Sequence, residues 1–196
     1  VTDIKLLELA SLDRPLLREL SLHAPGTWNH SVIMSQISEA AAEAIGVNRI
    51  LTRVGSYYHD IGKLKKPAYF IENQSGIDNK HDKLTPSMSA LIIKAHVKDG
   101  VEMARKIGLP ERLVEFIPQH HGTALIEYFY DKAKQENQDG EEVDESHYRH
   151  GGPKPQSKEA GILMLADCVE AASRTLDDVS PARVQGLVQK MINKIF

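Results

Sequence analysis

The stretch SYYHDIGK, residues 56–63, places a histidine and an aspartate side by side behind an apolar run that is typical of a helix. His59 and Asp60 therefore fall at the inner end of a predicted helix over 48–60. Two adjacent polar side chains at that depth cost free energy unless other groups pair with them. The positions of the remaining histidines indicate where those partners come from.

Helix signals dominate the rest of the chain, and the alternation typical of strands is nearly absent. Thr85 and Ser180 each precede a proline, a common start of a helix, and Gly46 and Gly108 follow apolar segments as helix stops. The sequence therefore predicts an all-α fold. We expect helices over 3–10, 14–22, 28–45, 48–60, 86–107, 111–121, 124–136, 158–176 and 181–195, with a break near His96 left open.

Composition indicates one globular domain over residues 1–196, with N-terminal helices at 1–22 and a C-terminal helix at 178–196. The net charge of −3 gives no reason to expect a nucleic-acid polymer as partner. The single cysteine, Cys168, excludes an internal disulfide and fits a small buried hydrophobe.

No segment approaches the roughly 20 apolar residues that cross a bilayer, so we expect that this part of the protein needs no membrane contact. A first residue other than methionine predicts a domain cut from a longer protein.

Two long segments lack a helical pattern. Residues 65–84 carry proline, glycine and asparagine signals around an aromatic-rich centre. Residues 137–157 begin acidic and end basic, which predicts a mobile insert in the acidic half. The basic half lies just before a predicted helix, so it presents cations and a helix N-terminus to a phosphate.

His30 is predicted to point into the core of the helix over 28–45. An apolar stripe predicted along this helix extends to His30 when helical steps of three and four residues are taken toward the N-terminus. The stripe consists of Ile33, Met34, Ile37, Ala41, Ala44 and Ile45.

Imidazoles and carboxylates recur at the inner ends or inner faces of five predicted helices. A lone inward histidine is more often a hydrogen-bonded core residue than a ligand. Seven such groups would each need a separate partner, whereas one metal cluster satisfies them together. The candidate ligands are His30, His59, Asp60, His96, His120, His121 and Asp167.

Five imidazoles and two carboxylates are too many for one tetrahedral zinc ion, and cysteines do not recur at zinc-finger spacing. Two six-coordinate ions fit better, with Asp60 bridging them through its two oxygens. The mixture of nitrogen and oxygen ligands favours iron or manganese, with zinc, cobalt and nickel as further options. The sequence therefore predicts a dinuclear metal centre in the core of a helical bundle.

The ordered pattern H…HD…H…HH…D resembles the HD-domain metal-dependent phosphohydrolases, and its many histidines resemble their dinuclear phosphodiesterase branch. Three segments, 59–74 (HDIGKLKKPAYFIENQ), 96–100 (HVKDG) and 151–174 (GGPKPQSKEAGILMLADCVEAASR), are similar to the cytoplasmic HD domain of bacterial seven-transmembrane HD phosphodiesterases. Those enzymes hydrolyse cyclic di-AMP. The resemblance covers about residues 20 to 176 and implies a membrane-anchored parent protein with this domain at the cytoplasmic face.

The resemblance also implies the ligand sets and the substrate. Related cyclic di-GMP phosphodiesterases follow their histidine doublet with a signature containing Gly-Tyr-Pro, whereas this chain continues GTALIEYFY after His121. We therefore expect cyclic di-AMP as substrate, cleaved to linear 5′-pApA. The implied ligands are His30, His59 and Asp167 for one ion and His96, His120 and His121 for the other, with Asp60 as the bridge.

In the expected mechanism a hydroxide bridging the two ions attacks phosphorus in line with the ribose 3′ oxygen. Lys63 either reaches the phosphate or protonates the leaving oxygen, unless it is a solvated lysine at a helix end. Asp60 and Lys63 are the expected catalytic residues. We further expect Arg149 and Lys154 to contact the substrate phosphates. Tyr69 and Phe70 either stack on an adenine or pack on the core, and His81 supports the site from its loop. No metal role is expected for His23, His147 and His150.

Other functions stay open at this point. An HD nucleotidase or a deoxynucleotide triphosphohydrolase resembles a mononuclear H…HD…D set and leaves His96 and the doublet unexplained. A silent HD module would bind a nucleotide and signal through a partner. A structural helical protein would bind no transition metal. The sequence also leaves the oligomeric state open, with a homodimer as one option.

Overall fold

The computed structural model describes residues 2–74, 79–137, 142–174, 176 and 180–195. Across these ranges the chain has no strand, only an isolated bridge between Leu125 and Arg149, so the all-α prediction is confirmed. The α-helices are α1 (Asp3–Leu9), α2 (Pro15–His23), α3 (Pro25–Ala44), α4 (Arg49–Tyr58), α5 (Pro86–Lys106), α6 (Glu111–Val114), α7 (Phe116–Gln119), α8 (Glu127–Glu136), α9 (Lys158–Ser173) and α10 (Pro181–Ile195). The 3₁₀ helices are η1 (Ile61–Lys65), η2 (Pro67–Tyr69), η3 (Ile71–Asn73), η4 (Lys80–Lys83) and η5 (Glu145–Tyr148).

Most helix boundaries follow the local signals in the sequence. The Thr85 hydroxyl accepts a hydrogen bond from the Met88 amide at the start of α5. Gly46 and Gly108 follow α3 and α5 with φ of 70°, a conformation that glycine adopts without a Cβ clash. Helix α5 runs unbroken through His96, so the break left open at that residue is absent.

Several predicted helices differ from the structure at one end or by a break. The helix over 111–121 is split at Glu115 into α6 and α7, because Pro118 has no amide hydrogen to donate to the Val114 carbonyl. Helix α8 begins at Glu127 rather than 124, because residues 124–126 pair with residues 148–150 instead. The helix expected to reach 176 ends at Ser173.

The apolar stripe predicted for α3 is wrong except at Met34, although His30 does point inward. Ile33, Ile37 and Ile45 are 37%, 39% and 56% exposed, whereas His30 is 4% exposed. The buried face of α3 is built instead mostly from small side chains, which let the backbones of neighbouring helices approach closely. Its residues are Thr27, His30, Ser31, Met34, Ser35, Ser38 and Ala42.

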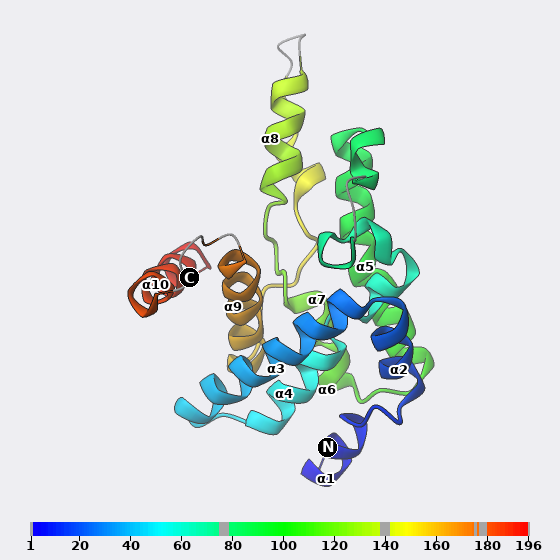
Figure 1. Cartoon of the computed structure of the whole chain (residues 1–196), viewed down its shortest axis with the longest axis vertical. Coiled ribbons are helices and arrows are strands. Elements are labelled where there is room, and N and C mark those ends of the chain that lie inside the picture. The colour runs from blue at the N-terminus through cyan, green and yellow to red at the C-terminus, as the bar shows by residue number, and fades with distance from the viewer. Residues whose placement is uncertain (1, 75–78, 138–141, 175, 177–179, 196) are drawn as a thin grey trace.

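Helix α3 lies along α4 and α9, and α5 packs against η1, so the segments that carry the candidate ligands surround one core (Figure 1). The N-terminal helices α1 and α2 contribute to the same core, and the Tyr58 hydroxyl donates a 2.6 Å hydrogen bond to the Leu9 carbonyl. In Figure 1, α8 projects away from the helical bundle, and α10 lies at the edge of the bundle, next to α9. That all 196 residues form one domain stays a prediction.

Both long segments are partly structured. Residues 65–84 form η2, η3 and η4 within their described part, and residues 75–78 lie outside it. Of the predicted mobile insert, 138–141 lie outside the described residues, and the remainder contains η5. Of the predicted C-terminal segment, 178, 179 and 196 lie outside them. No described helix combines the length and the apolar character needed to cross a membrane.

Candidate metal centre

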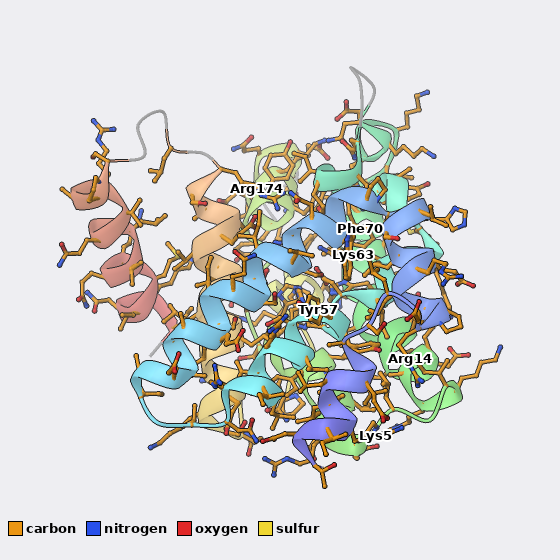
Figure 2. The ribbon with its side chains drawn as sticks, turned by 60° about the horizontal axis from the view of Figure 1, so that its bottom comes forward. Lys5, Arg14, Tyr57, Lys63, Phe70 and Arg174 are labelled. Carbon is orange, nitrogen blue, oxygen red and sulfur yellow. The ribbon has the colours of Figure 1, made fainter. Side chains whose placement is uncertain are left out.

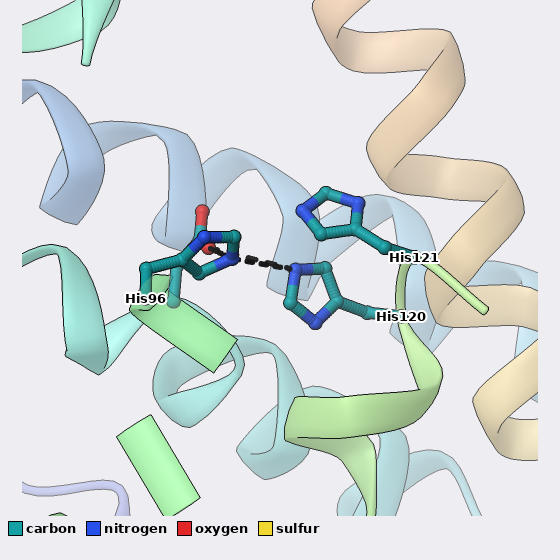
Figure 3. A group of neighbouring side chains, drawn as sticks. His96, His120 and His121 are labelled. Carbon is teal, nitrogen blue, oxygen red and sulfur yellow. Dashed lines mark hydrogen bonds and ion pairs between the residues drawn. The ribbon is translucent and has the colours of Figure 1, made fainter. Parts of the chain in front are cut away.

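Helical segments far apart in the sequence bring all the predicted ligand side chains to one place in the core. His59 and Asp60 follow α4 where the chain enters η1, and His96 lies in the middle of α5. Figure 3 shows His96 beside His120 and His121, which follow α7. His30 on α3 and Asp167 on α9 complete the cluster.

Gly62 allows η1 to lie directly against α5. A Cβ atom at this position would lie 1.8 Å from the His96 carbonyl oxygen and 2.5 Å from the Gly100 amide nitrogen. Both neighbours are backbone atoms of a helix, so no side chain can move aside to make room. The glycine two residues after Asp60 thereby sets the distance between this carboxylate and His96.

The two carboxylate oxygens of Asp60 face different histidines. Its Oδ2 lies 3.2 Å from His59 Nε2 and 3.9 Å from His30 Nε2. Its Oδ1 lies 3.4 Å from His96 Nε2 and 3.6 Å from His120 Nε2. The carboxylate therefore stands between two groups of imidazoles, in the position of a bridging ligand.

Asp167 joins the same cluster from α9. Its Oδ1 lies 3.1 Å from His30 Nε2, and its Oδ2 lies 3.6 Å from His121 Nδ1. Two groups of potential ligand atoms result, in each of which all atoms lie within 4.8 Å of one another. One group is His30, His59 and Asp167, and the other is Asp60, His96, His120 and His121.

Hydrogen bonds orient most of these rings toward the centre. The Nδ1 atoms of His59 and His120 lie 2.7 Å and 2.6 Å from carbonyl oxygens three residues earlier, and His96 Nδ1 bonds to Ile93 in the same way. A ring that donates from Nδ1 keeps the lone pair on Nε2, which is the atom available to a metal. The helical backbone therefore presets the ligating nitrogen.

Unpaired buried atoms support a metal at this place. His59 Nε2 and Asp60 Oδ1 are buried without a hydrogen-bond partner in the described structure. Buried polar atoms are rarely left unsatisfied, because each costs roughly 1–3 kcal/mol. A divalent cation would accept both lone pairs, and the imidazole and carboxylate donors suit such an ion. The residues present thus fit divalent metal binding.

The electrostatics hold four of the donors in their ligating forms but favour a proton on His30. Burial lowers the pKa of His30, but its hydrogen bonds to Asp167 and Glu170 raise it to about 9, so a bound ion would have to displace that proton. Burial lowers the pKa of His96 to about 3 and holds the pKa of His121 well below its usual range, so both rings are neutral at pH 7. Burial alone would raise the pKa of Asp60, but the charges of Lys63 and His59 hold it well below its usual range. The pKa of Asp167 is about 2, because the hydrogen bond and charge of His30 outweigh burial.

Lys63 is largely enclosed by the site, with 13% of its side chain exposed. Its Nζ lies 2.7 Å from Asp60 Oδ2, 2.7 Å from Glu72 Oε1 and 5.0 Å from the ring centre of Phe70, with the Lys63 and Phe70 side chains labelled in Figure 2. The alternative of a solvated helix-end lysine is therefore excluded. Burial by itself lowers the pKa of Lys63, but the negative charges of Asp60 and Glu72 outweigh this effect and raise the pKa above its ordinary value. The ammonium group is thus better suited to hold a phosphate than to give up a proton.

A cavity of about 590 Å³ opens beside the cluster. Lys63, His96 and His121 lie at the end nearest the candidate ligands. The remaining lining is largely apolar and aromatic, with a few amide, carboxylate and imidazole groups. These residues are Tyr69, Phe70, Ile71, Glu72, Gln74, Asn79, His81, Ile93, Ala124, Leu125, Ile126, Tyr128, Phe129 and His150.

The two loop aromatics differ in their surroundings. Phe70 is 5% exposed and packs edge-on against His96, so its ring belongs largely to the core. Tyr69 is half-buried and its ring packs edge-on against His81. Nε2 of His81 also lies 2.8 Å from the Tyr69 carbonyl oxygen, so His81 holds this loop in place.

His150 was expected to have no metal role, yet it lies against the metal centre. Its ring centre is 4.2 Å from that of His121 and 6.2 Å from that of His96. Burial lowers its pKa to about 4, so the ring is neutral. Its position depends on the pairing of 148–150 with 124–126, for which the sequence carries no signal.

Two carboxylates beside the cluster were not predicted from the sequence. Glu170 lies 2.6 Å from His30 Nδ1 and accepts hydrogen bonds from Arg174. Glu72 pairs with Lys63 and accepts a hydrogen bond from the Thr27 hydroxyl. The three-residue spacing from Asp167 puts Glu170 on the same helix face, so helical periodicity was sufficient to find it.

The predicted phosphate contacts lie outside the cavity lining. Arg149 is paired with Glu145, and its Nη1 donates a 3.0 Å hydrogen bond to the Thr123 carbonyl. Lys154 is exposed. Their role stays a prediction. His23 and His147 are exposed and lie outside the two groups of potential ligands found among the described residues, and their lack of a metal role stays a prediction.

Replacing Glu170 with alanine is expected to weaken divalent metal binding about 10–100-fold, the usual effect of losing a group that orients a ligand. The carboxylate fixes the tautomer and ring position of His30. Titration with Mn²⁺ in a calorimeter measures the change. Glu159 on the same helix accepts a hydrogen bond from the exposed Asn48 amide and is not one of the candidate ligands, so Glu159→Ala is the matched control with unchanged affinity. Equal affinities in both variants would contradict the role assigned to Glu170.

Comparison with known proteins agrees with this geometry. The HD domain family model matches residues 27–172. The chain is 49% identical over 193 residues to the cyclic-di-AMP phosphodiesterase PgpH of Bacillus subtilis and 44% identical over 196 residues to PgpH of Listeria monocytogenes. These alignments cover 98% and 100% of this chain. The chain spans 27% of the length of each of these two curated relatives.

Solved structures show the same fold. The crystal structure of the L. monocytogenes PgpH HD domain has a TM-score of 0.86 at 43% identity, covering 92% of this chain and 84% of that one. The same domain in complex with cyclic di-AMP has a TM-score of 0.88 at 44% identity, covering 94% and 85%. With the family match extending over 27–172, the chain belongs to the HD domain family and is homologous to the HD domains of PgpH.

Proposed function

We propose that this chain is a metal-dependent phosphodiesterase that hydrolyses cyclic di-AMP to linear 5′-pApA. The observation that carries the proposal is the placement of Asp60 between two histidine groups at the end of a large cavity. The names of the two curated relatives and the complex of the Listeria domain with cyclic di-AMP support the choice of substrate.

Two metal ions are proposed, one for each group of ligand atoms. His30, His59 and Asp167 would hold the first, His96, His120 and His121 the second, and Asp60 would bridge them. The donors are nitrogen and oxygen atoms, which favours iron or manganese. Such a pair supplies a water nucleophile that is active at neutral pH and neutralises charge on the phosphate.

Lys63 would hold a non-bridging phosphate oxygen. Its ammonium group already contacts Asp60 and Glu72 at the edge of the cavity, so it lies beside the proposed ions. Glu72 keeps the lysine charged and positioned, and Thr27 in turn holds Glu72. We propose Arg149 and Lys154 as outer phosphate contacts, for which Arg149 must exchange its pairing with Glu145.

The cavity suits a dinucleotide of two bases. Its volume of about 590 Å³ falls within the roughly 300–1,000 Å³ usual for ligand pockets. Tyr69 offers a ring for stacking, and the amides of Gln74 and Asn79 offer donors and acceptors to a base edge. The apolar wall limits water around the phosphodiester. A homodimer, and a cytoplasmic location in a longer membrane-anchored protein, stay predictions.

Product analysis tests the proposal. With Mn²⁺ present, equal amounts of cyclic di-AMP and cyclic di-GMP in one reaction should give mainly linear 5′-pApA by chromatography. Omitting the metal and adding a chelator should abolish the product. Equal turnover of the two substrates would contradict the assignment of cyclic di-AMP as the preferred substrate, but the protein would still be a phosphodiesterase. Cleavage of mononucleotides without cleavage of cyclic dinucleotides would favour a nucleotidase.

A further inference from the structure

The ring of His121 is held differently from the other histidine rings of the cluster. The other four have an Nδ1 atom bonded to a backbone carbonyl or to Glu170. For His121 the described structure contains no such bond. Its Nδ1 lies 3.6 Å from Asp167 Oδ2, which is longer than a hydrogen bond. A side chain with two rotatable bonds and 24% exposure needs another constraint to hold one orientation.

Aromatic contacts supply that constraint. The His121 ring lies 3.8 Å from the ring centre of His120 at an interplanar angle of 45°, and 4.2 Å from that of His150 at 35°. His96 meets it edge-on at 5.2 Å. His120 and His96 belong to the proposed ligands themselves. His150 is therefore the contact that comes from outside the ligand set.

His150 is buried without an evident hydrogen-bonding reason. Its side chain is 8% exposed, and its Nδ1 has no hydrogen-bond partner in the described structure. An unpaired buried nitrogen is unfavourable, so the position is held by packing of the ring rather than by polar contacts of that atom. The partner in that packing is the ring of His121.

The backbone joins the two histidines through one residue. The Ala124 amide donates to the His121 carbonyl at 2.9 Å, and the His150 amide donates to the Ala124 carbonyl at 3.0 Å. The bridge between Leu125 and Arg149 continues this pairing. The main-chain hydrogen bonds therefore hold the two backbone segments side by side, which brings both rings within contact distance.

We propose that His150 is a positioning residue, whose ring packs at an inclined angle against that of His121 and keeps it oriented for metal binding. The inference rests on the proposed function, because it takes His121 as a ligand. This ring contact orients His121 as a hydrogen bond to a carbonyl or a carboxylate orients the other four rings. The segment 148–150, which lies almost thirty residues beyond the histidine doublet, thereby becomes part of the metal centre.

The test compares three substitutions by their affinity for Mn²⁺ alone, measured by competition with a fluorescent chelator. His150→Ala removes the ring and should lower the affinity for one of the two bound ions about 10-fold or more, as the loss of an orienting group usually does. His150→Phe keeps a ring and should retain affinity close to that of the unaltered protein. His150→Asn keeps a polar group without a ring and should behave like the alanine variant.

His147→Ala is the matched control, since this histidine directly precedes the segment 148–150 and its side chain is 74% exposed. The Mn²⁺ affinity of this variant should not change. Circular dichroism checks folding, and if the alanine variant unfolds, the comparison of phenylalanine with asparagine decides. Unchanged Mn²⁺ affinity of the asparagine variant together with reduced affinity of the phenylalanine variant would overturn the role of the ring contact. Wild-type affinity in all three variants would overturn it as well. Absence of Mn²⁺ binding by the unaltered protein would instead remove the proposed function and this inference with it.

Discussion

Asp60→Asn is expected to abolish hydrolysis of cyclic di-AMP, with a loss of at least about 1,000-fold, well beyond the roughly 10–100-fold typical of groups that only orient a ligand. The substitution keeps the shape of the side chain but replaces one oxygen with an amide NH₂, which cannot bind a cation. One of the two histidine groups then loses its shared ligand. Bound metal should fall below two ions per chain, measured by elemental analysis of the purified variant.

The asparagine variant should remain a folded helical protein, because Lys63 keeps its ion pair with Glu72 and is not left as an unpaired buried charge. Asp99→Asn is the matched control, since Asp99 pairs with Lys65 at the surface of α5 and is not one of the candidate ligands. Its activity and metal content should equal those of the unaltered chain. Full activity of Asp60→Asn in a folded protein would refute the bridging role.

Gly62→Ala is expected to have the largest effect on stability. The added Cβ would lie 1.8 Å from the His96 carbonyl oxygen, so η1 and α5 must separate or bend. We expect a loss of more than about 4 kcal/mol, the range of exceptional substitutions. For a chain of this length the melting temperature should then fall by roughly 10 °C or more. Thermal unfolding followed by circular dichroism measures the change.

Gly186→Ala is the control for the same chemical change. Gly186 lies inside α10, where an added Cβ meets nothing within 4 Å. Alanine favours a helix over glycine by about 0.5–1 kcal/mol, so this variant should melt slightly higher than the unaltered protein. A Gly62→Ala variant as stable as Gly186→Ala would show that the close approach of η1 to α5 is not as described.

The candidate ligands were predictable because each is an unusual residue in its local context. His59, Asp60 and Asp167 stand within apolar helical patterns, where a polar group is noticeable. Helical periodicity places each of them on an inner face but does not say which of them meet in space. The division into two ligand sets came from a family resemblance, and the structure brings the same two groups together.

Other features depended on packing that a hydropathy pattern does not record. The buried face of α3 carries serines rather than the isoleucines expected there, because close helix contact selects small side chains. The position of His150 follows from a short pairing between two distant segments. The break at Glu115, by contrast, was readable from Pro118, which cannot donate a helical hydrogen bond.

The central claim is that Asp60 bridges two metal ions. Anomalous diffraction from crystals of the protein loaded with Mn²⁺, recorded above and below the manganese edge, tests it most directly. We predict two peaks about 3.5–4 Å apart, one on each side of the Asp60 carboxylate. A single peak, or manganese elsewhere while His59 and His96 face only solvent, would contradict it.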